Sequence, residues 1–192
     1  MTNYRRRRTF GGSFFFSVAL ADRRATTLTD RIDDLRAAYA AMRLRRPFRC
    51  DAFVVLPDHL HAVWTLPGDD YDYSTRWRHF KAGFTRAVGD DLPIKSRLSH
   101  RRKGERGLWQ RRFWEHELTT DADLRAHIEY CWLNPVKHGL VRRPIDWPYS
   151  SLHVALKRGE AEAKWAETPK VDLFGDPVRW VETHPTPSAY YA

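Results

Sequence analysis

The chain has 192 residues, 42% of them hydrophobic and 14% aromatic, which is enough to bury a core in one domain without help from a metal or disulfides. Its formal net charge of +9 at pH 7 favours a polyanionic partner. The two cysteines match no zinc spacing, and no apolar stretch approaches the roughly 20 residues of a membrane span, so we expect a cytoplasmic protein.

Strand-like and helical segments alternate along the chain. In chain order they are a strand at residues 9–20, a helix at 26–45, strands at 48–56 and 59–66, a helix at 74–88, a strand at 108–116 and a helix at 121–133. The expected helix caps are Thr29 or Asp30, Ser74 and Asp121. Pro135 is expected to end the last helix, because proline pushes the residue before it out of helical geometry.

This order of elements is typical of an α+β fold of the ferredoxin-like kind, in which helices pack on an antiparallel sheet. We expect that fold to occupy residues 1–153. Residues 154–192 would form an irregular tail that contains Pro and Trp and packs on the domain or extends from it, after a short helix near residues 150–159. The polar, basic segment 90–107 is long for a loop without structure, and such loops are often functional or mobile.

Two histidines, His59 and His61, lie within the strand predicted at residues 59–66. Residues two apart on a strand point to the same face, so both imidazoles are expected to lie close together and could bind one divalent cation. Histidines in a strand are more often structural, and the residues alone leave both interpretations open. Asp58 adds a carboxylate nearby, although a turn between Pro57 and Asp58 explains it equally well.

Tyr130 lies on the last predicted helix, beside rather than within its buried stripe of Leu124, Ile128 and Cys131. Asn134 follows on the same helix face, where its amide oxygen could complete the ligand set of a metal. The alternative is that Asn134 only precedes the proline in a C-terminal turn. A tyrosine hydroxyl beside a cation that polarises a phosphate could act as a nucleophile, and the covalent product would be reversible, as strand transfer requires.

Basic and aromatic residues interleave at several places, a pattern typical of single-strand nucleic-acid binding, in which Arg contacts phosphate and flat rings stack on bases. The alternative is a basic protein whose charges are only solvated. The expected nucleic-acid contacts are Arg5, Arg6, Arg7, Arg8, Arg78, Lys81, Arg111, Arg112, Trp114, Lys137 and His138.

Four segments of the chain form a recognisable set of motifs. They are Leu56-Pro57-Asp58-His59-Leu60-His61, Trp109-Gln110-Arg111-Arg112-Phe113-Trp114-Glu115-His116, Tyr130-Cys131-Trp132-Leu133-Asn134-Pro135-Val136-Lys137-His138-Gly139-Leu140 and Asp146-Trp147-Pro148-Tyr149-Ser150-Ser151. In these segments the chain resembles the REP-associated tyrosine transposases, which are domesticated bacterial relatives of the single-tyrosine HUH transposases. The resemblance runs from about Tyr4 to His153, in the same order and spacing. One departure is the pair Cys131 and Trp132, where the family often has an aliphatic residue and His.

The resemblance implies a ferredoxin-like HUH nuclease fold, with Mg²⁺ or Mn²⁺ on His59 and His61 and with Asn134 as the third ligand. It implies that Tyr130 forms a 5′-phosphotyrosine bond to single-stranded DNA, at a palindromic repeat that folds into a hairpin beside a guide sequence. The expected protein is a monomer or homodimer associated with the nucleoid. The alternative function is a non-catalytic basic module that binds hairpin DNA or RNA, and a covalent protein–DNA adduct would separate the two.

Overall fold

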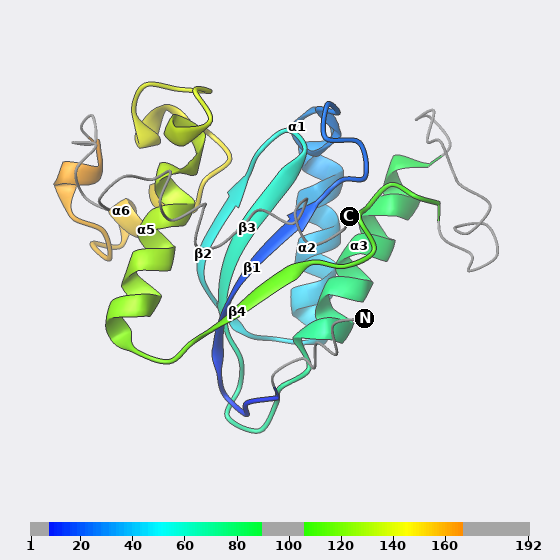
Figure 1. Cartoon of the computed structure of the whole chain (residues 1–192), viewed down its shortest axis with the longest axis horizontal. Coiled ribbons are helices and arrows are strands. Elements are labelled where there is room, and N and C mark those ends of the chain that lie inside the picture. The colour runs from blue at the N-terminus through cyan, green and yellow to red at the C-terminus, as the bar shows by residue number, and fades with distance from the viewer. Residues whose placement is uncertain (1–7, 90–105, 167–192) are drawn as a thin grey trace, which may run out of the picture.

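A computed structural model of the chain describes residues 8–89 and 106–166. Within these residues an antiparallel sheet of four strands has the spatial order β2-β3-β1-β4 (Figure 1). The strands are β1 (Ser13–Ala19), β2 (Arg49–Val55), β3 (His59–Thr65) and β4 (Trp114–Leu118). Because β3 lies between the parallel strands β1 and β2, the sheet has the split arrangement of ferredoxin-like folds. The expected α+β fold is confirmed.

Helices cover both faces of the sheet. In chain order they are α1 (Thr27–Asp30), α2 (Ile32–Arg45), α3 (Tyr73–Val88), α5 (Asp121–Lys137), the 3-10 turn η1 (Pro144–Asp146), α6 (Leu152–Lys157) and the 3-10 turn η2 (Ala163–Ala166). In Figure 1, α2 and α3 lie on one side of the sheet, and α5 and α6 lie on the other. No helix in the described parts of the chain is long and apolar enough to cross a bilayer.

The alternation of side chains along β1 fills both layers between sheet and helices. Phe14 and Phe16 belong to the cluster under α2 and α3, where Trp64 of β3 stacks on Trp77 of α3 with ring centroids 4.1 Å apart. Phe15 points to the other face and packs with residues of β3 and α5. Apolar contacts therefore hold helix α5 against the face of the sheet to which β3, the strand of the predicted histidines, contributes.

The last strand lies further along the chain than residues 108–116, so that prediction is wrong in its position. Trp109 makes only an isolated bridge with Leu20, and the chain then leaves the sheet before β4 begins at Trp114. In between, Phe113 is buried in the aromatic cluster under α3. The favourable free energy of burying this large ring offsets the loss of strand pairing at this point.

Helix α5 does not end before Pro135, as the sequence predicted, but continues to Lys137. Proline has no backbone N–H, so the hydrogen bond to the carbonyl one turn earlier is missing. Near the end of a helix this single hydrogen bond is the main loss. The carbonyls of Asn134 and Pro135 still accept hydrogen bonds from the backbone N–H groups of His138 and Leu140, at 3.0 and 2.9 Å. The last turn therefore stays helical and keeps Asn134 on the helix.

The other helix boundaries differ in smaller ways. The helix predicted at residues 26–45 is divided at Arg31, whose φ of −114° and ψ of 39° interrupt the helical path while its side chain bonds Asp34 at 2.6 Å. The observed side-chain caps are Asp72 for α3 and Thr120 for α5, in place of Ser74 and Asp121, and α1 and α2 have no side-chain cap at Thr29 or Asp30.

Residues 150–166 pack on the α5 side of the sheet. The expected short helix is α6, and Leu152 and Trp165 are buried in the same cluster as Trp132 of α5. The rings of Trp132 and Trp165 lie 5.3 Å apart, and Trp132 Nε1 donates to Ser151 Oγ at 3.2 Å. Most of the predicted 90–107 loop and the tail beyond residue 166 lie outside the described residues.

Candidate active site between strand β3 and helix α5

The two histidines of β3 project from the face of the sheet that α5 covers. In the strand register His59 and His61 lie opposite Ala19 and Ser17 of β1, whose small side chains leave space for both imidazoles. The ring centroids of the two histidines are 5.1 Å apart, and the residues are only 5% and 6% exposed. The structure therefore brings together the pair that the sequence singled out, on one face and almost out of solvent.

His59 is oriented by Asp58. Its Nδ1 lies 2.7 Å from Asp58 Oδ1, while Asp58 Oδ2 pairs with Arg23 Nε at 3.0 Å. Arg23 Nη2 also lies 3.4 Å from His59 Nδ1, but the shorter contact favours the tautomer in which Nδ1–H donates a hydrogen bond to the carboxylate and Nε2 carries the lone pair. Burial alone would raise the pKa of Asp58, but the hydrogen bond and charge of His59, with the charge of Arg23, lower it.

His61 is held as a neutral base. Its ring stacks on Phe15 with centroids 5.3 Å apart. Burial, and then the charges of His59 and His138, lower the pKa of His61 well below its ordinary value of 6.5. Its Nδ1 is buried and has no hydrogen-bond partner among the residues that the structure describes. A neutral imidazole with an unused nitrogen is the form that binds a metal ion.

Tyr130 lies on α5 next to His61, with ring centroids 5.3 Å apart, and its edge meets Phe15 at 5.6 Å. Lys137 Nζ lies 5.1 Å from the centroid of the Tyr130 ring. Burial raises the pKa of Tyr130 to about 12, and the nearby Asn134 amide opposes this rise. The phenol therefore keeps its proton at neutral pH. In any reaction in which the hydroxyl oxygen acts as a nucleophile, the proton must leave during the attack.

Asn134 and His138 continue the stripe of α5 that begins at Tyr130. Asn134 is fully buried, and neither of its amide atoms has a hydrogen-bond partner within residues 8–89 and 106–166. The ring centroid of His138 lies 5.0 Å from that of His59. Partial burial, and then the charge of His59, lower the pKa of His138 to about 4. The sequence did not predict this contact with His59, because it requires the helix to continue past Pro135.

The structure divides the predicted nucleic-acid contacts into two groups. Lys137 and His138 border the paired histidines, and Trp114 of β4 meets Phe15 on the same face with ring centroids 5.7 Å apart. The second group lies on α3 and the segment before β4, around a cavity of about 580 Å³, and consists of Arg78, Lys81 and Arg111.

Within this second group Lys81 is anchored through its ammonium group, by one polar contact and by one contact with a ring. Its Nζ donates to the carbonyl of Gln110 at 2.7 Å and lies 5.6 Å from the ring centroid of Trp109. Arg112 is exposed nearby, and Arg8 lies over the ring of Tyr71 at 5.7 Å. The remaining predicted contacts, Arg5, Arg6 and Arg7, lie outside the described residues.

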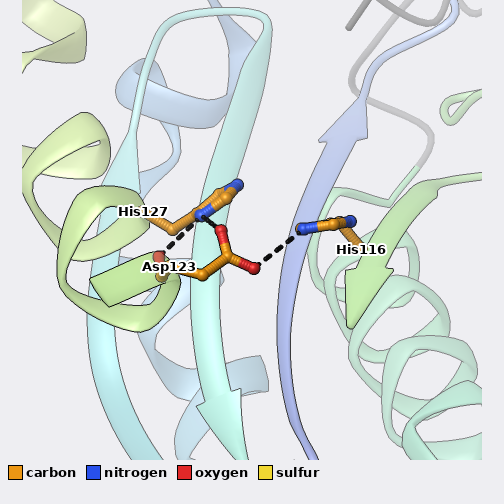
Figure 2. A group of neighbouring side chains, drawn as sticks. All are labelled: His116, Asp123 and His127. Atoms are coloured by element: carbon orange, nitrogen blue, oxygen red, sulfur yellow. Dashed lines mark hydrogen bonds and ion pairs between the residues drawn. The ribbon is translucent and has the colours of Figure 1, made fainter. Parts of the chain in front are cut away.

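A second cluster of histidines and a carboxylate was not predicted. His116 of β4 and His127 of α5 flank Asp123 from the first turn of α5 (Figure 2). Asp123 Oδ2 lies 3.1 Å from His116 Nε2, and Asp123 Oδ1 lies 2.9 Å from His127 Nδ1. One ligand atom from each residue lies within 4.8 Å of the others, so the group could hold a metal ion. The helical spacing of Asp123 and His127 was the available signal.

The chain is similar to known proteins over most of its length, although no protein-family profile matches it. The chain is 42% identical over 166 residues to the REP-associated tyrosine transposase of Escherichia coli (strain K12), and the match covers 86% of this chain and 92% of that protein. The chain belongs to the REP-associated tyrosine transposases. A Haemophilus influenzae relative with the same family name is 42% identical over 178 residues, which cover 92% of this chain and 99% of that one.

Membership of the REP-associated tyrosine transposases agrees with the fold. A solved structure of a REP-associated tyrosine transposase bound to a REP hairpin matches this chain with a TM-score of 0.77 at 40% identity, over 91% of this chain and 96% of that one. The family resemblance found in the sequence is thereby confirmed. The protein is an enzyme of the HUH type, a transposase whose family uses a tyrosine nucleophile.

Proposed function

We propose that this transposase cleaves and rejoins single-stranded DNA beside hairpins formed by palindromic repeats, through a 5′-phosphotyrosine bond on Tyr130. The observation that carries the proposal is the meeting of His59, His61 and Tyr130 from two different elements, with neighbouring ring centroids 5.1 and 5.3 Å apart. The relative whose structure holds a REP hairpin supports hairpin DNA as the substrate.

His59, His61 and Asn134 are proposed to hold one Mg²⁺ or Mn²⁺ ion. The donor set fits, because Asp58 leaves Nε2 of His59 with its lone pair, and because His61 Nδ1 and both amide atoms of Asn134 are buried without partners among the described residues. Such atoms are uncommon in proteins and favour a role as ligands. Hard cations prefer oxygen, so substrate phosphate and water would complete the set. The cation, when bound, supplies Lewis-acid polarisation of the scissile phosphate.

Tyr130 is proposed as the nucleophile. Its hydroxyl oxygen attacks the phosphorus, the bond from phosphorus to the 3′ oxygen breaks, and one strand leaves with a 3′ hydroxyl while the 5′ phosphate stays on the tyrosine. The phenol proton must leave during this attack, since a pKa of about 12 keeps it in place beforehand. The Lys137 ammonium, 5.1 Å from the ring, would stabilise the negative charge that develops there. Attack by a 3′ hydroxyl on the phosphotyrosine reverses these steps and rejoins the strands.

The predicted DNA contacts are proposed to act at two places. Lys137, His138 and Trp114 would contact the single strand at the active site, where aromatic rings can stack on unpaired bases. Arg78, Lys81 and Arg111 would hold phosphates of the hairpin or of its flanking guide sequence in the cavity beside α3. Because DNA is the proposed substrate, we expect the protein at the nucleoid.

A protein–DNA adduct that survives denaturation tests the proposal. A hairpin oligonucleotide with a single-stranded flank, labelled at its 3′ end, is incubated with the protein and Mn²⁺ and run on a denaturing gel. The wild-type chain is expected to form a labelled adduct, and Tyr130→Phe is expected to bind the DNA without forming one. Tyr149→Phe is the matched control, because it removes a hydroxyl from a tyrosine packed against the opposite cluster. Undiminished adduct in Tyr130→Phe would overturn the assignment.

The metal part of the proposal has a separate test. His59→Ala and His61→Ala are each expected to abolish Mn²⁺-dependent cleavage, while Asn134→Ala should weaken it less, since an amide is one neutral ligand among several. His79→Ala, on α3 at the other side of the sheet, is the control for loss of a histidine. Cleavage that proceeds equally well in excess chelator would contradict the metal site and leave the tyrosine assignment standing.

A further inference from the structure

We infer that His116, Asp123 and His127 form a second cation site, separate from the paired histidines of β3 and selective for a transition-metal dication. The two imidazoles lie nearly parallel, with ring centroids 5.1 Å apart and an interplanar angle of 29°. Figure 2 shows both rings turning a nitrogen toward the same carboxylate. One strand and the first two turns of one helix therefore present three ligands to a common point.

The distances in this cluster are those expected of ligands that share an ion. Two ligand atoms about 2.1 Å from one metal ion lie roughly 3.0 Å apart at a right angle and about 3.4 Å apart at a tetrahedral angle. The nitrogen–oxygen distances here are 3.1 Å for His116 and 2.9 Å for His127, from the two oxygens of Asp123. Each nitrogen therefore already lies at the spacing from a carboxylate oxygen that a shared ion would require.

Burial makes the cluster more than a surface ion pair. The His127 side chain is 2% exposed, while those of Asp123 and His116 are 29% and 35% exposed. His116 is further fixed by Trp114, whose ring stacks on it at 5.9 Å with an interplanar angle of 11°. Packing therefore restricts the side chains of His127 and His116, while the partial exposure of Asp123 and His116 leaves the cluster accessible to solvent.

The chemistry of the donors selects the class of ion. Two imidazoles and one carboxylate are the ligand set of zinc enzymes and of sites for Fe²⁺ and Co²⁺, whereas Mg²⁺ prefers oxygen ligands and keeps its water. His127 Nδ1 lies 2.8 Å from the carbonyl oxygen of Asp123 and donates to it. Metal binding must replace that hydrogen bond and release a proton, so the affinity for the ion should fall as the pH falls.

The position of the cluster indicates what an ion there would do. It joins β4 to the start of α5, the helix that carries Tyr130 at a later turn. Phe15 separates it from the active site, since the Phe15 ring meets His127 at 4.9 Å and His61 at 5.3 Å. An ion in this cluster is therefore placed to fix the helix of the proposed nucleophile, not to touch the DNA phosphate.

The competing explanation is that Asp123 only accepts two hydrogen bonds, from His116 and His127, and binds no ion. Co²⁺ separates the two explanations, because its visible absorption reports ligand number and geometry. The full chain carrying His59→Ala and His61→Ala, which lacks the first pair of histidines, is dialysed against Co²⁺ and then Zn²⁺ at pH 7.5. We expect it to retain one tightly bound ion per chain with a tetrahedral or five-coordinate Co²⁺ spectrum, which millimolar Mg²⁺ does not displace.

Further variants assign the ion to the cluster. Asp123→Asn and His116→Gln are made on the same background, at partly exposed positions. Loss of a group that supports a metal only indirectly lowers the metal affinity about 10–100-fold, so loss of a direct ligand should lower the Co²⁺ affinity by at least that much. His79→Ala on that background should bind as tightly as its parent. Absence of tight Co²⁺ and Zn²⁺ binding in the parent, or equal binding by the Asp123→Asn and His79→Ala variants, would overturn the inference. Because the paired histidines are already removed, either result leaves the proposed active site untouched.

Discussion

The Asp58→Asn variant distinguishes loss of metal binding at the proposed active site from general damage to the fold. Asp58 Oδ1 accepts a hydrogen bond from His59 Nδ1 at 2.7 Å and thereby fixes which nitrogen of His59 carries the lone pair. Asparagine keeps the size but removes the charge, and its amide can turn an N–H toward the ring. Loss of a carboxylate behind a metal-binding histidine lowers metal affinity about 10–100-fold, which is roughly 1.4–2.8 kcal/mol. The ion pair with Arg23, which is 45% exposed, contributes less than about 1 kcal/mol to folding, so the variant should fold.

The assay is the initial rate of hairpin cleavage as a function of Mn²⁺ concentration. The half-saturating concentration is expected to rise about 10–100-fold in Asp58→Asn, with a maximal rate close to that of the wild type. Asp34→Asn is the control, because Asp34 is a similarly placed carboxylate, 2.6 Å from Arg31 Nε, on a helix of the other layer. An unchanged Mn²⁺ dependence, or a loss of rate that saturating Mn²⁺ does not restore, would refute the role assigned to Asp58.

Three further outcomes are expected. The melting temperature should fall from pH 7 to pH 5, because His61 is protonated near pH 6.5 in the unfolded chain but has a lowered pKa in the folded chain. Calorimetry should show that this group changes the free energy of unfolding by at most about 1.4 kcal/mol per pH unit, and His61→Gln should reduce that slope. Trp77→Ala should cost about 3–5 kcal/mol in urea unfolding, because it removes the ring stacked on Trp64, whereas Phe10→Ala, at a side chain that is 61% exposed, should stay within about 0.5 kcal/mol. Lys81→Ala should reduce the slope of log affinity against log salt by about one, while Arg36→Ala on α2 should not, and a hairpin with a single-stranded flank should outbind a blunt duplex of equal length.

Local periodicity was enough to predict most of the fold. The hairpin of β2 and β3 and the helix α3 were found to within about a residue or two, because alternating and helical apolar patterns there coincide with burial. The start of β4 was missed because large apolar residues at positions 108, 109 and 113 favoured an earlier strand. In the structure Phe113 is instead buried in a cluster of rings that only the tertiary fold brings together. Long-range packing of this kind leaves no local signal.

The candidate site divides in the same way. Residues two apart on a strand must share a face, so the pairing of His59 and His61 follows from the sequence. The contact between His59 and His138 does not, since it depends on how α5 crosses the end of β3 and on a helix that tolerates Pro135. The cluster around Asp123 depends likewise on the distance between β4 and α5, which no spacing in the sequence records.

The two faces of the sheet differ in what they bury. Toward α2 and α3, β1 and β3 present Phe14, Phe16 and Trp64, and burial of these rings stabilises the fold. Toward α5, β3 presents two nearly buried imidazoles, and Asn134 adds an amide without partners in the described residues. Each buried polar atom without a hydrogen bond costs about 1–3 kcal/mol, so this face is less stable than an apolar one would be. Successive side chains of a strand point to opposite faces of the sheet. The aromatic rings on the α2 and α3 side can therefore offset this destabilisation without contacting the histidines.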